Sequence, residues 1–480
     1  MRSNYFDLTL KSISSIHLIV FIALALNFCS CKKDGFTKDT SAQLNITADS
    51  LKFDTIFTAT GSYTQSFKIK NPNDQKLLIS SIQLMGGDRS SFHLNVNGYS
   101  GSQRNDIEIA AFDSIYVFVA VNIDPNNNNL PFIVTDSILI QFNNNNQFVQ
   151  LEAFGQNAHF CRDIIIHNDT TWTNDLPYVI LGGLTIDSNA VLTLDQGCKI
   201  FVHSNAPILV DGTLIANGEK SNEVMFTGDR LDEEYRDLPA SWPGIYFRKK
   251  SIDNLLQFCI IKNATNAINV DQPSTNGNPK LTAHQIIIDN ASESGLNAVH
   301  SSFSIDNSLI SNCGKNIVIN YGGEYEFTNC TAVALSTLYQ LHENPVLELN
   351  NLFNDNGSIL TDNLVCSFNN CVLWGDGGGF DDELLITKEG STVFDIKIEN
   401  SLIKNATDPN FAILNNVIRN IDPAFDSIDI ANNYFDFRIN NQIASPLIDA
   451  GSSTAFSKDL DNQPRLSGSM TDIGCYEKQQ

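Results

Sequence analysis

Two loops rich in carboxylates are the places where this sequence could bind a ligand or carry out chemistry. Residues 232–237 read DEEYRD, and residues 376–383 read DGGGFDDE. The glycines of the second loop allow a sharp bend that would fold oxygens around a hard cation such as calcium, the one cofactor suggested. We expect that site to use Asp376, Asp381, Asp382 and Glu383. Its spacing differs from the twelve-residue calcium loop between helices, so a solvated loop is the alternative interpretation.

A compact basic cluster is the second candidate site. Arg248, Lys249 and Lys250 directly follow the apolar stretch GIYF at residues 244–247. Such a cluster could act as a base or bind an acidic sugar. Exposed cations at the end of a strand are also common, and this is the alternative interpretation.

Other catalytic signatures are missing from the sequence. The histidines are scattered, and no HExxH motif, nucleotide-binding loop or ordered Ser/His/Asp set occurs. Hydrolytic triads and zinc chemistry are therefore unsupported. Trp172, Trp242 and Trp374 could stack on sugar rings, although Trp242 is more simply explained as a structural residue of the WPGIYF turn.

The composition excludes one class of partner and favours one class of fold. The formal net charge is −24, whereas nucleic-acid binding normally needs a basic patch. We therefore expect no nucleic-acid partner. Charged residues make up 18% of the chain, and long helical runs of Glu and Lys are absent, which favours an all-β protein with many tight turns.

Residues 1–30 carry a targeting pattern. The apolar run at residues 16–26 is too short to span a bilayer comfortably, and Ser30, a small residue, directly precedes Cys31. The segment resembles a bacterial lipoprotein signal, which implies cleavage after Ser30 and lipidation of Cys31. The lipid would anchor the chain to the outer membrane of a cell envelope, facing either side, with residues 31–43 as a tether. An ordinary signal peptide or an uncleaved anchor is the alternative.

Residues 44–158 contain about eight short β-prone stretches separated by turn residues, a spacing that predicts a β-sandwich. The stretch FKIKNPNDQKLLI at residues 67–79 and the closing strand VQLEAFG resemble immunoglobulin-like domains of the abnormal-spindle/hydin type. That resemblance implies a spacer or a protein-binding module without catalytic residues.

Residues 159–440 repeat a short apolar phrase followed by a polar turn. The phrase occurs as FCIIKNA (258–264), IIIDNA (286–291), SLISNC (308–313) and SLIKNA (401–406). Residues 303–306 and 325–328 are 22 positions apart, which is about one coil of a solenoid. The region resembles the right-handed parallel β-helix of pectate-lyase-like proteins. A β-propeller is less favoured because blade-length repeats are missing.

Polar and sulfur-containing residues recur at the predicted corners of this coil. Asn263, Asn290, Asn312 and Asn405 are expected to stack their amides there. Most cysteines have the setting of small buried apolar residues. A disulfide remains open for some of them, for example between Cys366 and Cys371.

Residues 441–480 are expected to cap the β-helix, because the end of a solenoid exposes unpaired strand edges. The phrases SPLIDAG, DLDNQPR and DIGCYE resemble the choice-of-anchor Q type of terminal segment. Arg465 is placed to pair with Asp459, Asp461 or Asp472 and to hold the tail over the last coil.

The predicted fold is thus all-β: an N-terminal immunoglobulin-like β-sandwich, then a right-handed parallel β-helix with a C-terminal cap. The leading function is non-catalytic binding of a glycan or a surface partner by a lipid-anchored envelope protein. One alternative is a polysaccharide lyase or glycoside hydrolase acting in the β-helix groove, near residues 232–250 or 376–383. The other alternative is an architectural spacer.

Overall fold

The computed structural model describes residues 35–58, 61–124, 132–379, 381–440 and 443–479. These residues fall into two compact units, one ending at residue 155 and the other beginning at residue 156. The signal segment and Cys31 lie outside the described residues. Within the described part, helix is limited to the short 3₁₀ turns η1 (Gly87–Arg89) and η2 (Ile430–Asn432). No helix found there has the length and apolarity needed to cross a membrane.

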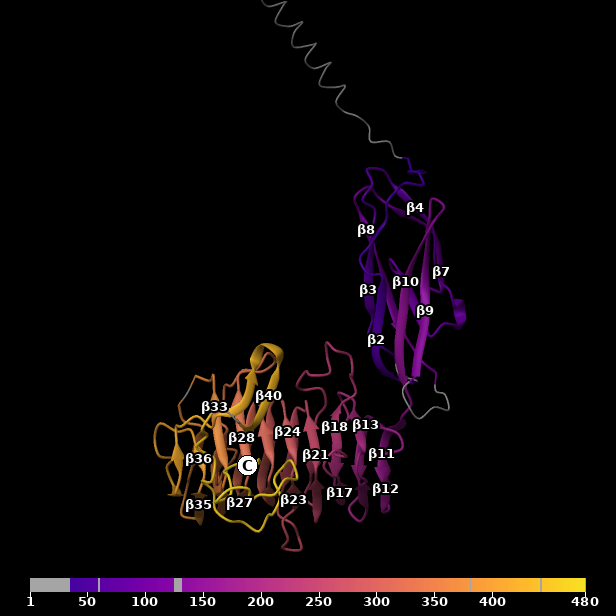
Figure 1. Cartoon of the computed structure of the whole chain (residues 1–480). Helices are drawn as coiled ribbons and strands as arrows, with labels where there is room; N and C mark the ends of the chain where they lie inside the picture. Colours follow the sequence, from indigo (N-terminus) through magenta and orange to yellow (C-terminus); the bar gives the residue numbers. More distant parts are fainter. Residues whose placement is uncertain (1–34, 59–60, 125–131, 380, 441–442, 480) are drawn as a thin grey trace, which may run out of the picture. The chain divides into compact units, whose positions relative to one another are not determined.

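The first unit is a β-sandwich of two five-stranded antiparallel sheets (Figure 1). One sheet has the order β1 (Asn45–Ile46), β3 (Gln65–Lys70), β8 (Ser114–Val121), β5 (Phe92–Val96), β6 (Tyr99–Ser100). The other has the order β2 (Ser50–Phe57), β10 (Asn145–Gln156), β9 (Phe132–Phe142), β4 (Leu77–Leu84), β7 (Gln103–Ile109). Alternate residues such as Val117 and Val119 fill the core, and the prediction of an immunoglobulin-like sandwich is confirmed.

The segment expected to be a tether is partly joined to this sandwich. Phe36 forms a β-bridge with Lys76, and the amide of Asn143 donates hydrogen bonds to the carbonyls of Thr37 and Asp39. Residues from 36 onward therefore belong to the folded unit, because their backbone groups find partners there. This part of the 31–43 segment is not a free tether.

The second unit is a parallel β-helix, which confirms the fold class predicted from the repeats. Its 26-stranded parallel sheet winds through three faces, and β11, β13, β25 and β27 bend to join two of them. We call the first the open face: β12 (Thr170–Trp172), β14 (Val191–Leu194), β17 (Thr213–Asn217), β20 (Asn254–Gln257), β23 (Leu281–His284), the later parts of β25 (Ser294–Asp306) and β27 (Lys315–Thr328), β32 (Leu364–Asn369), β35 (Phe394–Glu399), β37 (Ala412–Asn415).

We call the second face the tail face, because the C-terminal part of the chain covers it. It contains the early parts of β11 (His159–Ile166) and β13 (Tyr178–Ile186), β15 (Lys199–Val202), β18 (Val224–Gly228), β21 (Cys259–Lys262), β24 (Ile287–Asp289), β26 (Leu309–Ser311), β28 (Thr331–Leu335), β33 (Val372–Asp376), β36 (Leu402–Ile403), β38 (Ile418–Arg419). The third face contains the later parts of β11 and β13 and the early parts of β25 and β27. It also contains five whole strands: β16 (Ile208–Val210), β19 (Ile245–Phe247), β22 (Asn266–Asp271), β29 (Leu347–Asn350) and β34 (Leu384–Thr387).

The strand register confirms the repeat seen in the sequence. Leu281 pairs with Phe303, and Phe303 pairs with Tyr325, so each of these coils takes 22 residues (303 − 281 and 325 − 303). Tyr325 then pairs with Cys366, a longer step that contains the hairpin β30 (Leu352–Asp355) and β31 (Ser358–Thr361). Insertions of this kind project from the coil without disturbing its core.

The asparagine corner is partly as predicted. Asn263, Asn290 and Asn312 all have positive φ, and the amide of Asn290 donates to the Oδ1 atom of Asn263 at 2.8 Å. Asparagine suits this position because its short polar side chain tolerates the left-handed conformation. Asn405 has another role, since its Oδ1 atom accepts the backbone N–H of Leu384.

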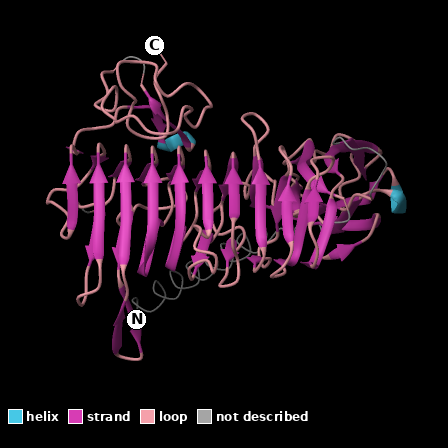
Figure 2. Ribbon diagram, turned by 90° about the horizontal axis from the view of Figure 1, so that it is seen from below, coloured by secondary structure: helices cyan, strands magenta, loops and turns pink. Residues whose placement is uncertain are grey.

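The C-terminal segment does not close the end of the solenoid, and this prediction was wrong. The hairpin β39 (Phe425–Asp429) and β40 (Tyr434–Ile439) precedes it, within the range predicted to be β-helix, and together they form the tail, residues 425–440 and 443–479, which runs along the side of the β-helix (Figure 2). Its apolar residues cover outward-facing side chains of the tail face, in two clusters: Phe437, Leu460, Cys475 and Tyr476 with Leu309, Val333 and Leu335; Ile439, Leu447 and Ile473 with Val372 and Leu402.

The physical reason lies in the pattern of the tail-face strands. The strands beneath the tail, β26, β28, β33 and β36, carry apolar residues on both sides. In β36, for example, Ile403 enters the core and Leu402 faces the tail. Leaving the outward set in water would be unfavourable, so the chain covers it. The end of the solenoid is left partly uncovered, since Leu414, which packs against the core at the last coil, is only half-buried.

Candidate functional site

A groove lies on the open face of the β-helix. Its floor consists of outward-facing residues of three neighbouring strands, Ser302 and Ser304 in β25, Glu324 and Glu326 in β27, and Ser367 in β32. Alternation along each strand turns these polar groups outward while Phe303 and Tyr325 enter the core. The groove has a volume of about 540 Å³, within the usual range for a small-molecule site.

Two segments form the walls of the groove. One wall is the loop between β22 and β23, which includes Pro273, Gly277 and Asn278. The amides of Asn276 and Asn278 donate to the carboxylate of Asp253 at 2.8 and 2.9 Å, so the loop is held in place. The other wall includes Asp362, whose Oδ2 atom lies 3.0 Å from Nδ1 of His300. The groove is therefore preformed.

Tyr325 supports the groove from below and is not one of its reactive groups. Its hydroxyl donates to the carbonyl of Gly322 and accepts the N–H of Ser301, both at 2.9 Å. Burial raises the pKa of Tyr325 well above its ordinary value. Gly323, at φ +118°, is required here because a Cβ atom would lie 2.3 Å from this hydroxyl.

The charge of the groove restricts its chemistry. Its lining carries the carboxylates of Glu324, Glu326 and Asp362, whereas the described lining residues include no lysine or arginine. Hydroxyls and carboxylates together can hydrogen-bond the hydroxyls of a sugar. The carboxylates would repel an anionic polysaccharide. The lining also supplies no lysine or arginine that could act as the base in β-elimination of a uronic acid.

The four carboxylates expected to bind calcium are not brought together. Asp376 is exposed and pairs with Lys404, Asp382 accepts from Thr407, and Asp381 is exposed. Glu383 is buried, 2.9 Å from Nε2 of His342. Each carboxylate thus has a separate environment, and in the described part of the chain no group of three or more candidate ligands is placed to hold a metal ion.

Gly378 of that loop and Gly375, which precedes it in β33, are sites of close packing. A Cβ atom on Gly375 would lie 2.1 Å from Oε1 of Glu383, and one on Gly378 would lie 2.6 Å from Cδ2 of His342. The backbone at Gly375 and Gly378 passes directly over a buried His–Glu pair, whereas Gly377 has a φ of +73° and a Cβ atom on Gly379 would meet nothing within 4 Å. A steric cause therefore accounts for Gly378, one of the three glycines that suggested a cation site.

The loop at residues 232–237 is also structural. Both carboxylate oxygens of Asp232 accept hydrogen bonds from Arg230, at 2.9 and 3.0 Å. The carbonyls of Arg236 and Asp237 accept the corner amides of Asn263 and Asn290. The loop therefore completes the hydrogen bonding of the corner.

The basic cluster holds a buried lysine through its backbone. Nζ of Lys280 donates to the carbonyls of Arg248, Lys249 and Ser251 at 2.9, 3.1 and 2.9 Å. Burial lowers the pKa of Lys280 to about 8. Arg248 itself pairs with Asp211, whereas Lys249 and Lys250 are exposed.

The three tryptophans are not sugar platforms. Trp242 is fully buried and its Nε1 atom donates to the carbonyl of Lys262 at 2.8 Å. Trp172 is buried and stacks on Tyr178. Trp374 packs beneath the tail, with Nζ of Lys404 5.2 Å from its ring centroid.

The suggested disulfide is also absent. Cys366 and Cys371 are free, as are the other six cysteines of the described chain, and all eight are buried. Cys366 lies in β32 of the open face, whereas Cys371 directly precedes β33 of the tail face, in line with their role as small core residues.

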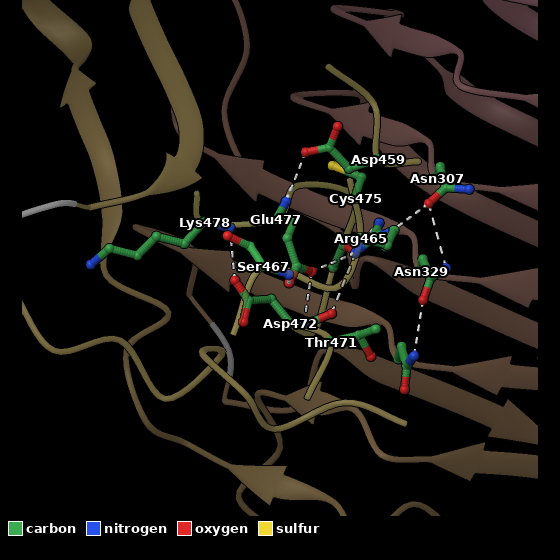
Figure 3. Close-up of polar contacts among 12 residues, drawn as sticks. Asn307, Asn329, Asp459, Arg465, Ser467, Thr471, Asp472, Cys475, Glu477 and Lys478 are labelled. Carbon is green, nitrogen blue, oxygen red and sulfur yellow. Dashed lines mark hydrogen bonds and ion pairs between the residues drawn. The ribbon is translucent and has the colours of Figure 1, made fainter. Parts of the chain in front are cut away.

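Arg465 holds the tail, with partners that differ from those expected (Figure 3). Its Nε atom donates to Oδ1 of Asn307 at 2.9 Å, and its Nη2 atom donates to the carbonyl of Gly474 at 2.7 Å. Its Nη1 atom forms an ion pair with Glu477 at 3.8 Å and donates to the backbone carbonyl of Asp472 at 3.4 Å. The side chain is only 1% exposed.

The aspartates around Arg465 satisfy other donors. The carboxylate of Asp459 accepts the backbone N–H groups of Gln463 and Glu477, and Asp461 pairs with Lys220 and Arg438. Asp472 accepts the N–H groups of Asp449 and Lys478. Asp459 and Asp472 fold the tail upon itself, since backbone N–H groups need acceptors in a buried segment, whereas Asp461 also ties the tail to Lys220 of the β-helix.

A second asparagine corner receives the tail. Asn307, Asn329 and Asn370 have positive φ in successive coils, and the amide of Asn370 donates to Asn329 at 2.9 Å. Asn370 also donates to the carbonyl of Ser452 and accepts its N–H. The sequence carries a signal for this corner, because asparagine precedes Ser or Cys in DNS, TNC and NNC at residues 306–308, 328–330 and 369–371.

Comparisons with known proteins assign no family to the chain. No family model and no curated protein matches the chain. Among solved structures, a protein of unknown function from Porphyromonas gingivalis W83 matches with 12% identity and a TM-score of 0.18, over 25% of this chain and 49% of that one. A PapD-like domain of human CEP192 matches with 11% identity and a TM-score of 0.17, over 27% of this chain and 94% of that domain. The present chain thus spans about half the length of the first of these structures.

Proposed function

We propose that this chain is a lipid-anchored envelope protein that binds a neutral glycan, without catalysis, in the groove of its open face. The observation that carries the proposal is the groove itself: a preformed concavity lined by hydroxyls and carboxylates, on a face that the tail leaves uncovered. Lipidation at Cys31 would hold it at the outer membrane, and a surface protein bearing such a glycan is the partner we expect. A purely architectural spacer has no need for such a groove.

One observation favours an enzymatic alternative, glycoside hydrolysis. Glu324 and Glu326 lie on the same side of one strand, and residues two apart on a strand are about 7 Å apart. That spacing falls in the range of inverting glycosidases, about 6.5–9.5 Å. Both side chains are exposed, however, whereas a catalytic acid needs an environment that raises its pKa.

The test uses the full chain and cellohexaose, chitohexaose, xylohexaose and laminarihexaose, with binding followed by calorimetry and cleavage by reducing ends. We expect one or more to bind, and the double variant Glu324→Gln/Glu326→Gln to weaken binding at the groove by about tenfold or more, or ~1.4 kcal/mol.

The exposed Glu108 of β7 provides the control, because Glu108→Gln removes the same charge from the sandwich. Unchanged binding in the double variant would contradict the proposed site. Release of reducing ends that disappears in Glu326→Gln would replace the proposal with the hydrolase alternative.

A further inference from the structure

A second concavity lies in the sandwich, where the outward side of β3, β8 and β5 meets the edge of that sheet; Leu84 of β4 and the loop residues Gly87, Asp88 and Ser90 also line it. Its volume is about 670 Å³. Ala120 in β8 forms the floor, and the strand register sets His93 of β5 beside it. Thr64, which directly precedes β3, lies on the other side, since Gln65 pairs with Val119. A small residue between longer neighbours creates the hollow.

An aromatic ring forms one end of this hollow. Tyr116, Phe118 and Ala120 alternate along the same side of β8, so Phe118 stands between the other two. One face of its ring stacks on Tyr116, with centroids 5.7 Å apart and planes 14° apart. Nζ of Lys68 lies 4.6 Å from the Tyr116 centroid. This stack supports one face of the Phe118 ring, and the side chain, which is 39% exposed, also lines the hollow beside Ala120.

The polar groups around the ring are neutral hydrogen-bonding groups. Asn95, opposite Phe118 in the register, is oriented by two contacts: Oδ1 accepts the N–H of Gly98 at 2.9 Å, and Nδ2 donates to Oγ of Ser100 at 3.3 Å. His93 and Thr64 add an imidazole and a hydroxyl. The acid in the lining, Asp88, accepts from Ser102, and no lysine or arginine lines the hollow in the described chain.

From this geometry we infer that the sandwich carries its own binding site for a neutral glycan, with a pyranose ring stacked on Phe118 above Ala120. A fixed aromatic face supplies apolar contact for the C–H side of a sugar, and the amide, imidazole and hydroxyls match its hydroxyl groups. The absence of cations in the lining disfavours acidic sugars and phosphates. This site is separate from the β-helix groove, so the inference does not depend on the proposed function.

The test uses the full chain with the same four hexasaccharides and measures affinity and stoichiometry by calorimetry. We expect Phe118→Ala to weaken binding at this site at least tenfold, and Ala120→Leu to abolish it by filling the floor. Both positions face outward, so thermal unfolding should change little. Phe148→Ala, which removes a 48% exposed ring from β10 of the other sheet, is the matched control.

The outcomes separate this inference from the proposed function. If both sites bind, the stoichiometry is two and falls to one in Phe118→Ala and in Glu324→Gln/Glu326→Gln. A stoichiometry of one that responds only to Phe118 supports the inference and contradicts the groove. The inference is overturned if no hexasaccharide binds, if Phe118→Ala and Ala120→Leu bind like the parent chain, or if Phe148→Ala loses as much affinity.

Discussion

Replacing Arg465 with methionine is expected to destabilise the docked tail by about 3–5 kcal/mol. The buried guanidinium is the counter-charge for Glu477 and also donates to Asn307 and Gly474. Methionine fills similar space, but at pH 8, where Glu477 is ionised, it leaves a buried carboxylate without its partner. Urea unfolding should show the lower free energy of unfolding. Limited proteolysis should cleave within residues 443–479 earlier than it cleaves the β-helix.

Arg438 offers a matched control within the same tail. It pairs with Asp436 and Asp461, but its side chain is 48% exposed, and exposed ion pairs are worth about 0–1 kcal/mol. Arg438→Met should therefore have a small effect. Equal stability losses in Arg438→Met and Arg465→Met would contradict the anchoring role given to Arg465.

Docking of the tail is expected to weaken as the pH rises from 5 to 8. Burial raises the pKa of Glu477 to about 7 from its ordinary value of 4.5, and it also raises the pKa values of Asp459 and Asp472. Between pH 4.5 and 7 the folded Glu477 holds a proton that the unfolded chain releases. The stabilisation is therefore complete below about pH 4.5 and is lost as the pH passes 7, an effect on the order of a few kcal/mol.

The chosen pH range isolates this effect. Carboxyls with lowered pKa values, such as Asp461 and Asp449, start from 3.8, so their contributions change only in more acidic solution. The melting temperature and the rate of tail proteolysis should be compared at pH 5 and pH 8. Glu477→Gln should flatten the dependence. A tail that docks more stably at pH 8 than at pH 5 would contradict this prediction.

The repeating architecture was predictable from the sequence because its causes are local. The 22-residue spacing between Phe303 and Tyr325 is the length of one coil, and alternation in SSFSIDN and EYEFT separates core from surface. Positive φ at Asn263, Asn290 and Asn312 likewise follows from the residue type. Each of these inferences needs only a few neighbouring positions.

The sites were harder to predict because they depend on contacts distant in sequence. Arg465 meets Asn307 across 158 positions, and no local pattern shows that the tail follows a side face rather than the end. The groove needs the register of β25, β27 and β32, and β32 is reached only after a long insertion. The carboxylates of residues 376–383 show the opposite case: they are close in sequence, which suggested one shared site, but each has a different partner. Asp376 pairs with Lys404, Asp382 accepts from Thr407, and Glu383 contacts His342.

The central claim is that the tail closes one lateral face of the β-helix and leaves the open face accessible to a ligand. Thiol labelling of two matched variants of the full chain, mapped by peptide mass, tests it most directly. Val372→Cys lies on the tail face at a fully buried position, and Val365→Cys lies in the groove at a position 37% exposed. We predict that a maleimide reacts quickly with Val365→Cys and that it reacts with Val372→Cys only after Arg465→Met releases the tail. Equal labelling of the two cysteines in the parent background would contradict the account.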